Sequence, residues 1–188
     1  MGKLYWKPGN MLYPLPAVMV SVRDKDFDNI ITVAWAGTIN SDPAMLSISV
    51  RKERFSYDML MNSGEFVVNL VTKDLARACD YCGVASGRDV DKFEEMKLTK
   101  LDSKYVSAKS IEESPVNIEC KVRYTQELGT HTIFMAEVLG VTVDDKYMDE
   151  TGRFNLNDAN LITYSHGRYY TLGEQLGKFG HSVQKKRK

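Results

Sequence analysis

Apolar and polar residues alternate along several short segments of the chain, with the two-residue period of a half-buried β-strand. The clearest alternation spans residues 117–126, where Ile118, Cys120, Val122 and Tyr124 share one face and polar or charged residues occupy the other. The segments with strand character are residues 17–23, 30–35, 45–50, 65–70, 117–126 and 131–143. Short turns separate the first two segments and the last two, so each of these pairs is predicted to be antiparallel.

Other segments show the spacing of apolar residues that is typical of a helix, namely residues 56–62, 74–82 and 90–97. Ser56 is predicted to cap the first of them, because a serine hydroxyl satisfies a free N–H group at a helix start. No linker rich in Gly, Ser or Pro and no repeat divides the sequence. Short helices inserted between antiparallel strands favour a mainly β (α+β) fold, an antiparallel β-barrel with peripheral helices. The βαβ alternation and GxGxxG signature of a doubly wound sheet are missing from the sequence.

The charges of the chain balance, with 25 lysines and arginines against 25 aspartates and glutamates. This leaves no overall field that would recruit nucleic acid or an acidic membrane. The basic run at residues 185–188 is interpreted as a solvated end. No apolar stretch approaches the roughly 20 residues of a membrane-spanning helix, and the first residues lack the apolar core of a signal peptide. We therefore expect a cytoplasmic protein without a nucleic-acid or membrane partner.

The sequence has three cysteines, Cys79, Cys82 and Cys120. A low, odd number argues against a disulfide framework. Cys79 and Cys82 form a CxxC, but a redox CxxC normally opens a helix, whose dipole lowers a thiol pKa, and this pair lies late in its predicted helix. No second pair with zinc-binding spacing accompanies it. We interpret the cysteines as packing residues and predict no metal site, while any further role of the pair stays open.

A basic turn follows the strand-like residues 45–50. Arg51 and Arg54 lie in this turn, just before Ser56 and the predicted helix. Free N–H groups at a helix start attract anions, and two guanidinium groups beside them suit a phosphate. The turn is therefore a candidate seat for a phosphorylated cofactor, and the alternative is a solvated basic turn between two structural elements.

A series of segments, taken in order, resembles the flavin reductase-like family, whose members have the FMN-binding split-barrel fold and include flavoredoxin. They are PLPAVMVS (14–21), NIITVAWAGT (29–38), DPAMLSISVRKERFS (42–56), SGEFVVNL (63–70), SGRDVDKF (86–93), SPVNIECK (114–121) and GTHTIFMAEV (129–138). Each segment is moderately specific, and the likeness rests on their order and spacing. The resemblance implies one domain over residues 1–188. Its parts are a split barrel at about 14–145, a C-terminal capping segment at about 146–181 and a basic tail at 182–188.

The resemblance also assigns roles to individual residues. The residues that would line the edge of the flavin ring, where small side chains let backbone approach a flat ligand, are Trp35, Ala36, Gly37 and Thr38. The residues that would hold the ribityl chain and the phosphate are Ser49, Val50, Arg51, Arg54 and Ser56, with Tyr57 as a weaker candidate. Lys92 and Phe93, which the bare sequence places on the surface, belong to a region that approaches the flavin across a dimer interface. Lys92 would there supply positive charge near the reduced ring.

His131 is the candidate catalytic residue, because the resemblance places it near the flavin and the nicotinamide. An isolated histidine is otherwise more often structural or solvated. Family members usually read Gly-Asp-His here, whereas this chain reads Gly129-Thr130-His131. Without that carboxylate, the imidazole lacks a charge that would orient it or raise its pKa.

The activity that the resemblance implies is an FMN-dependent oxidoreductase working as a homodimer. It would take hydride from NADH or NADPH onto the flavin and pass electrons to free flavin, oxygen or a protein acceptor. The alternative is a flavoredoxin-type electron carrier that acts with a redox protein partner and has no specific nicotinamide pocket. A third reading is a non-catalytic module that uses the same barrel for another ligand.

Overall fold

The computed structural model describes residues 2–183, and within them the main body is a seven-stranded antiparallel sheet in the order β3-β2-β6-β9-β10-β5-β4. Its strands are β2 (Val18–Asp24), β3 (Phe27–Val33), β4 (Ala36–Ser41), β5 (Ala44–Arg51), β6 (Glu65–Leu70), β9 (Val116–Glu127) and β10 (His131–Val143). Both predicted hairpins are present, β2 with β3 and β9 with β10. The polar turn of the first hairpin is shorter than the sequence suggested, because the strands pair as far as Asp24 and Phe27.

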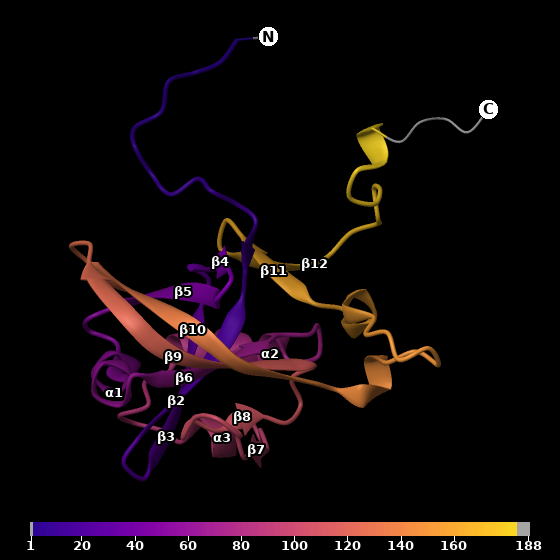
Figure 1. Ribbon diagram of the computed structural model, residues 1–188. Coiled ribbons are helices and arrows are strands. Elements are labelled where there is room, and N and C mark those ends of the chain that lie inside the picture. The colour runs from indigo at the N-terminus through magenta and orange to yellow at the C-terminus, as the bar shows by residue number, and fades with distance from the viewer. Residues whose placement is uncertain (1, 184–188) are drawn as a thin grey trace.

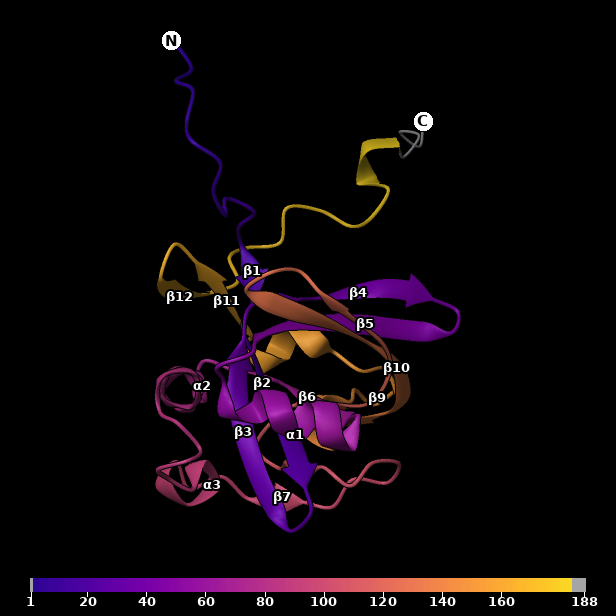
Figure 2. The same ribbon diagram turned by 90° about the vertical axis from the view of Figure 1, so that its left-hand side faces the viewer.

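The sheet closes into a barrel. β3 and β4 are separated in the chain only by Ala34 and Trp35, yet they lie at opposite edges of the sheet. So short a connection requires the sheet to curl until its edges approach each other. There the Ser49 N–H donates to the Trp35 carbonyl oxygen over 2.9 Å. Figure 2 shows the curled sheet with β4 and β5 across from β2 and β3, which confirms the predicted antiparallel barrel.

Short elements surround the barrel within residues 2–183. The helices are α1 (Phe55–Ser63), α2 (Ala76–Val84) and α3 (Lys92–Glu95), with 3-10 turns η1 (Asp145–Tyr147), η2 (Leu156–Ala159) and η3 (His181–Val183). The remaining strands are β1 (Leu15–Pro16), β11 (Ile162–Ser165) and β12 (Arg168–Thr171) in one small sheet, and β7 (Lys100–Leu101) with β8 (Ser110–Ile111) in another. Among these described residues, no helix is long and apolar enough to cross a membrane.

Strand β2 is buried on both faces, because the barrel core lies on one side and a helical layer on the other. Val18 and Val20 belong to the barrel core. Met19, between them, packs in a second core with Cys79 of α2 and Phe93 of α3. This double burial explains why the segment reads as a continuous apolar run rather than a strict alternation.

Helix α1 starts at Phe55, and Arg54, rather than Ser56, occupies its N-cap position, without a side-chain capping bond. The predicted Ser56 cap is therefore wrong. Ser56 is 1% exposed and its hydroxyl accepts a hydrogen bond from Asn29 Nδ2 (2.8 Å), so a tertiary contact replaces the local one. Leu60, one turn further on, reaches the barrel core.

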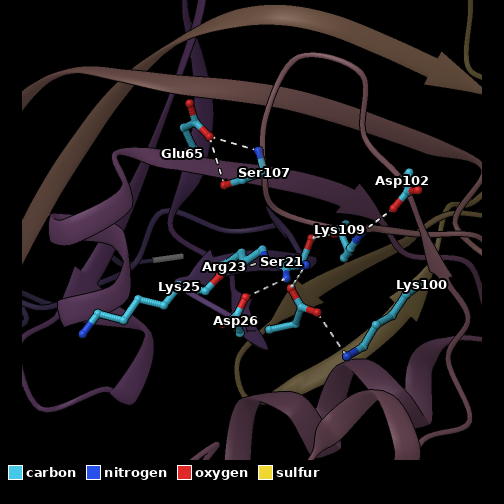
Figure 3. A network of polar contacts seen from close by, with 10 residues as sticks. Ser21, Arg23, Lys25, Asp26, Glu65, Lys100, Asp102, Ser107 and Lys109 are labelled. Carbon is cyan, nitrogen blue, oxygen red and sulfur yellow. Dashed lines mark hydrogen bonds and ion pairs between the residues drawn. The ribbon is translucent and has the colours of Figure 1, made fainter.

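A polar network braces the segment between β7 and β8 against the barrel (Figure 3). Asp28 of β3 pairs with Arg23 of β2 over 3.5 Å and with Lys100 of β7 over 3.1 Å. Further along the same segment, the Ser107 N–H donates to a Glu65 carboxylate oxygen over 3.0 Å. These contacts hold the segment to β2, β3 and β6, and we assign them a structural role.

The chain leaves the barrel at both ends. Residues 2–14 and 172–183, here called the terminal arms, extend from the small β1-β11-β12 sheet away from the body of the molecule (Figure 1). The arms carry large apolar side chains that are exposed, among them Leu4, Tyr5, Trp6, Leu12, Leu176 and Phe179. Residues 185–188 of the predicted basic tail lie outside the described residues, and the division into barrel, cap and tail stays a prediction.

Candidate functional site

A cavity of about 490 Å³ opens where the end of β3, the end of β5, the start of β10, α2 and the β11–β12 hairpin meet. Its size is typical of a cavity for a small molecule. Six of the residues singled out in the sequence lie on its wall: Trp35, Ser49, Val50, Arg51, Arg54 and His131. A smaller cavity of about 180 Å³ adjoins it, because Ile31 and Arg54 belong to the walls of both.

The smaller cavity lies at the start of α1 and is lined by cations from three segments of the chain. They are Arg54 at the helix start, Arg88 in the segment between α2 and α3, and Lys92 at the start of α3. Glu53 is the acidic residue of the same wall. Cations beside the free N–H groups of a helix start make this end of the site suited to an anion.

Lys92 is the most deeply buried of these cations, at 4% exposure. Its ammonium donates to the carbonyl oxygens of Ile30 (2.6 Å) and Cys82 (2.8 Å). Since an ammonium has three N–H donors, one is left for a ligand in the cavity. Burial lowers the pKa of Lys92 to about 8, a shift that Cys82 opposes and that the charge of Arg54 supports.

These contacts correct the surface position that the bare sequence gave to Lys92 and Phe93. Both side chains are buried within their own chain. Lys92 faces a cavity of the same chain. Phe93 packs in the helical core at 2% exposure. The approach of these residues to the flavin of a second subunit, which the resemblance implied, stays a prediction.

The far end of the larger cavity is aromatic. The rings of Trp35 and His131 lie 4.3 Å apart between centroids at an angle of 38°. Tyr164 and Tyr169 of the β11–β12 hairpin lie on the same cavity wall. Burial, followed by the Asp80 and Cys79 side chains, raises the pKa of Tyr169, so its phenol stays neutral. Flat apolar surfaces of this kind suit a planar ring system.

His131 stands beside a cation. It pairs with Arg51 across the β10–β5 ladder. Burial and then the Arg51 charge lower the pKa of His131, which Glu53 partly opposes. The imidazole is therefore neutral at pH 7. Its Nδ1 atom lies 2.9 Å from the Thr130 hydroxyl, which occupies the place of the missing carboxylate and orients the ring without adding charge.

The remaining predicted residues fall into two groups. Ala36 and Gly37 line a third cavity, of about 610 Å³, which also touches Trp35 and Ser49 and is bounded by part of the N-terminal arm. Thr38 and Tyr57 lie off the walls of all three cavities. Thr38 is exposed on β4. The Tyr57 hydroxyl instead lies 3.2 Å from the Thr132 hydroxyl.

Several wall residues were not predicted. Asp80 and Gly83 of α2 lie within or next to the CxxC, a motif that points to its two thiols and not to their neighbours. Tyr164 and Tyr169 belong to the C-terminal segment whose Tyr/Gly pattern predicted a cap over the barrel, and Arg88 lies inside the SGRDVDKF segment. Its closeness in sequence to Lys92, which the resemblance placed near the flavin, was the available signal for Arg88.

The cysteines are free and buried. Burial raises the pKa of Cys79 to about 12 and that of Cys82 to about 11. Both thiols therefore stay protonated at neutral pH, and a protonated thiol is a poor nucleophile. This agrees with the packing interpretation of the pair.

Comparisons with known proteins agree on one family. Residues 11–173 match the family described as "Flavin reductase like domain". The solved flavoredoxin of Desulfovibrio vulgaris (Miyazaki F) is similar with a TM-score of 0.90 and 29% identity, covering 97% of this chain and 100% of that one. Flavoredoxin from Methanosarcina acetivorans is similar with a TM-score of 0.88 and 25% identity, covering 98% of this chain and 100% of that one. An uncharacterized protein of Archaeoglobus fulgidus is 32% identical over 85% of this chain and 89% of its own length. The resemblance found in the sequence segments, and with it the split-barrel fold, is confirmed.

Proposed function

The chain belongs to the flavin reductase-like family, and on this premise we propose that it binds FMN and works as an oxidoreductase that takes hydride from NADH or NADPH. The observation that carries the proposal is the pair of adjoining cavities, of which the smaller is lined by three cations and the larger by the paired Trp35 and His131 rings. FMN has the matching parts, a phosphate and a planar ring joined by a flexible ribityl chain.

The phosphate end fits the group in charge and in hydrogen-bonding capacity. Arg54 and Lys92 supply charge, and Lys92 has a donor to spare. The Ser56 hydroxyl accepts from Asn29 and donates to no other residue among those the structure describes, which leaves its proton for a ligand oxygen. Charge-assisted bonds of this kind each contribute about 1.5–3 kcal/mol. We propose that these residues hold the phosphate of FMN within one chain.

At the ring end, the protein would orient the flavin ring and shield it from water. Trp35, Tyr164 and Tyr169 give the ring apolar walls, and no atom lies within 4 Å of the position a Cβ would take on Gly37, so a flat ligand can approach that strand. Bound FMN supplies the hydride acceptance and the onward electron transfer. The Arg51 charge next to neutral His131 would stabilise negative charge at this end of the cavity.

A flavoredoxin-type electron carrier is the second candidate. It is favoured by the two flavoredoxins among the similar structures, which match almost the whole chain. In this function a redox protein partner, rather than a nicotinamide, would exchange electrons with the flavin. The cavity geometry serves both candidates, and they differ in whether NADH or NADPH reduces the bound flavin.

We also propose that the protein is a homodimer located in the cytoplasm. The exposed apolar side chains of the terminal arms support the dimer, since a second copy would remove them from water. Sedimentation equilibrium is expected to give twice the mass of the chain. A monomer that binds FMN tightly would contradict the dimer and leave the FMN site intact.

Absorbance and kinetics test the function. We expect the purified protein to be yellow, or to become so with added FMN, at one flavin per chain. We also expect it to oxidise NADH or NADPH in the presence of FMN. A protein that takes up no FMN would refute both candidates and favour another ligand for the barrel. One that binds FMN but is reduced by neither nicotinamide would be an electron carrier.

A further inference from the structure

One wall of the 180 Å³ cavity is formed by an exposed arginine, Arg88, that the sequence pattern does not single out. Arg88 lies between α2 and α3, and its guanidinium reaches across to the start of α1. There it lies 3.5 Å from the Glu53 carbonyl oxygen and 5.2 Å from the centre of the Phe55 ring. The contact with Glu53 is long for a hydrogen bond, so the guanidinium can exchange it for a stronger, charged acceptor.

The backbone beside Arg88 is packed too tightly for the wall to move inward. A Cβ atom on Gly87 would fall 2.3 Å from Asn29 Oδ1 and 2.7 Å from Phe55 Cδ1. Contacts this short exclude any larger residue without displacement of its neighbours. The loop therefore fixes one boundary of the cavity, and the Arg88 side chain reaches from this loop to the start of α1.

The position of Arg88 has a consequence for the ligand. The phosphate of FMN is a terminal monoester that carries close to two negative charges at neutral pH. The corresponding phosphate of FAD continues into a second phosphate and an adenosine, which would have to pass the wall formed by Arg88, Glu53 and Phe55. A cavity of about 180 Å³ has no room to fold that extension inside.

We propose that Arg88 is a specificity-determining residue, which closes the cavity around a terminal phosphate monoester and rejects the pyrophosphate of FAD. This inference rests on the proposed FMN site. On this proposal, the Arg88 guanidinium and the wall around it discriminate between FMN and FAD. Arg54 and Lys92 would attract the phosphate of either nucleotide.

The test measures dissociation constants of the apoprotein for FMN, FAD and riboflavin by flavin fluorescence. The wild-type protein is expected to prefer FMN over FAD at least a hundredfold. Arg88→Ala should weaken FMN about tenfold, the value of one charge-assisted hydrogen bond, and leave riboflavin unchanged. FAD should be unaffected or bound more tightly, so that the FMN-to-FAD preference falls tenfold or more. Arg88→Lys, which keeps the charge but loses the planar fork, should fall between the two.

Arg77→Ala is the matched control, because Arg77 is an exposed arginine of α2 that lines a different cavity. It should change none of the three constants. An FMN-to-FAD preference that is the same in Arg88→Ala and the wild type, with unchanged thermal stability, would overturn the assignment. So would a wild-type protein that binds both nucleotides equally. A wild-type protein that binds riboflavin and FMN equally would refute the phosphate site itself, whereas one that binds no FMN would refute the proposed function.

Discussion

The two ends of the candidate site are built by different means. At the phosphate end, Lys92 and Ser56 are almost completely buried and each is held by a named partner. At the ring end, Trp35 is 37% exposed and touches His131 through ring contact alone. Hydrogen bonds between buried groups fix positions, whereas offset ring contacts tolerate small shifts. A ligand is therefore held firmly at the phosphate end, with Lys92 and Ser56, and more loosely at the ring end, with Trp35 and His131. We call the first the anchored end and the second the guided end.

The largest expected effect comes from removing the two arginines that flank the turn between β5 and α1, one of which, Arg54, belongs to the phosphate end. Replacing Arg51 and Arg54 together by alanine should weaken FMN binding by at least about a hundredfold, since charge-assisted bonds to phosphate contribute about 1.5–3 kcal/mol each. Riboflavin, which lacks the phosphate, should lose less than about threefold. Because Arg54 borders both cavities and Arg51 only the larger one, Arg54→Ala alone should reproduce most of the loss. Titration of the flavin fluorescence measures all of these constants.

Lys52→Ala provides the control for this experiment. Lys52 lies in the same turn, but its ammonium pairs with Glu127 over 2.7 Å and is exposed. Its removal should leave both affinities unchanged. Equal losses for FMN and riboflavin in the double variant would show that the arginines hold the ring or the fold, and the division of the site into two ends would then fail.

Strands could be predicted from the sequence where apolar residues are dense or alternate with polar ones. The predicted residues 65–70 and 131–143 coincide with β6 (Glu65–Leu70) and β10 (His131–Val143). β4 was missed, because most of its residues, AGTINS, are exposed and form no apolar face. It is a strand because β5 pairs with it at the sheet edge. The pattern of apolar residues identifies buried strands, whereas β4 is recognised only by its hydrogen-bonded pairing with β5.

The candidate site was predictable in part for a similar reason. Arg51, Arg54 and Ser56 are close in sequence, so a local pattern could bring them together. The burial of Lys92 depends on the carbonyl oxygen of Ile30, 62 residues away, and no local pattern reports such a contact. Tyr164 and Tyr169 reach the cavity only because β11 and β12 fold back beside β1. The resemblance to a family named the barrel, but it did not supply these particular contacts.

A smaller effect should come from deprotonation of the buried Lys92 ammonium above pH 8. It should raise the stability of the apoprotein and lower its affinity for FMN. The pKa of Lys92 is about 8 in the folded chain and 10.5 in a solvated lysine. Between these values the unfolded chain binds more protons than the folded one, so the stability of the apoprotein should rise from pH 8 to pH 10. FMN prefers the charged ammonium, so its affinity should fall about tenfold over roughly one to two pH units above 8.

Lys92→Met removes the titrating group and should flatten both pH profiles. Urea denaturation of the apoprotein and FMN titrations at pH 7, 8 and 9 make the comparison. Because the second ionisation of a phosphate monoester lies near pH 6, the ligand does not change charge in this range. A wild-type FMN affinity that is constant from pH 7 to pH 9 would remove Lys92 from the anchored end.

The smallest effect on binding is expected at the guided end. His131→Ala should change FMN affinity by less than about tenfold, or 1.4 kcal/mol, because Arg54, Arg88 and Lys92, the cations of the smaller cavity, are left in place. The same change should slow the reduction of bound FMN by NADH or NADPH about tenfold, since a side chain stacked on Trp35 at the ring end influences how the hydride donor is placed. The neutral imidazole predicts that this contribution stays constant from pH 7 to pH 9. Stopped-flow reduction at saturating FMN measures the rate, with His181→Ala in the C-terminal arm as the control. An unchanged rate with a lowered melting temperature would make His131 a packing partner of Trp35, and Arg51 would then be the residue at this end that keeps a proposed part in the chemistry.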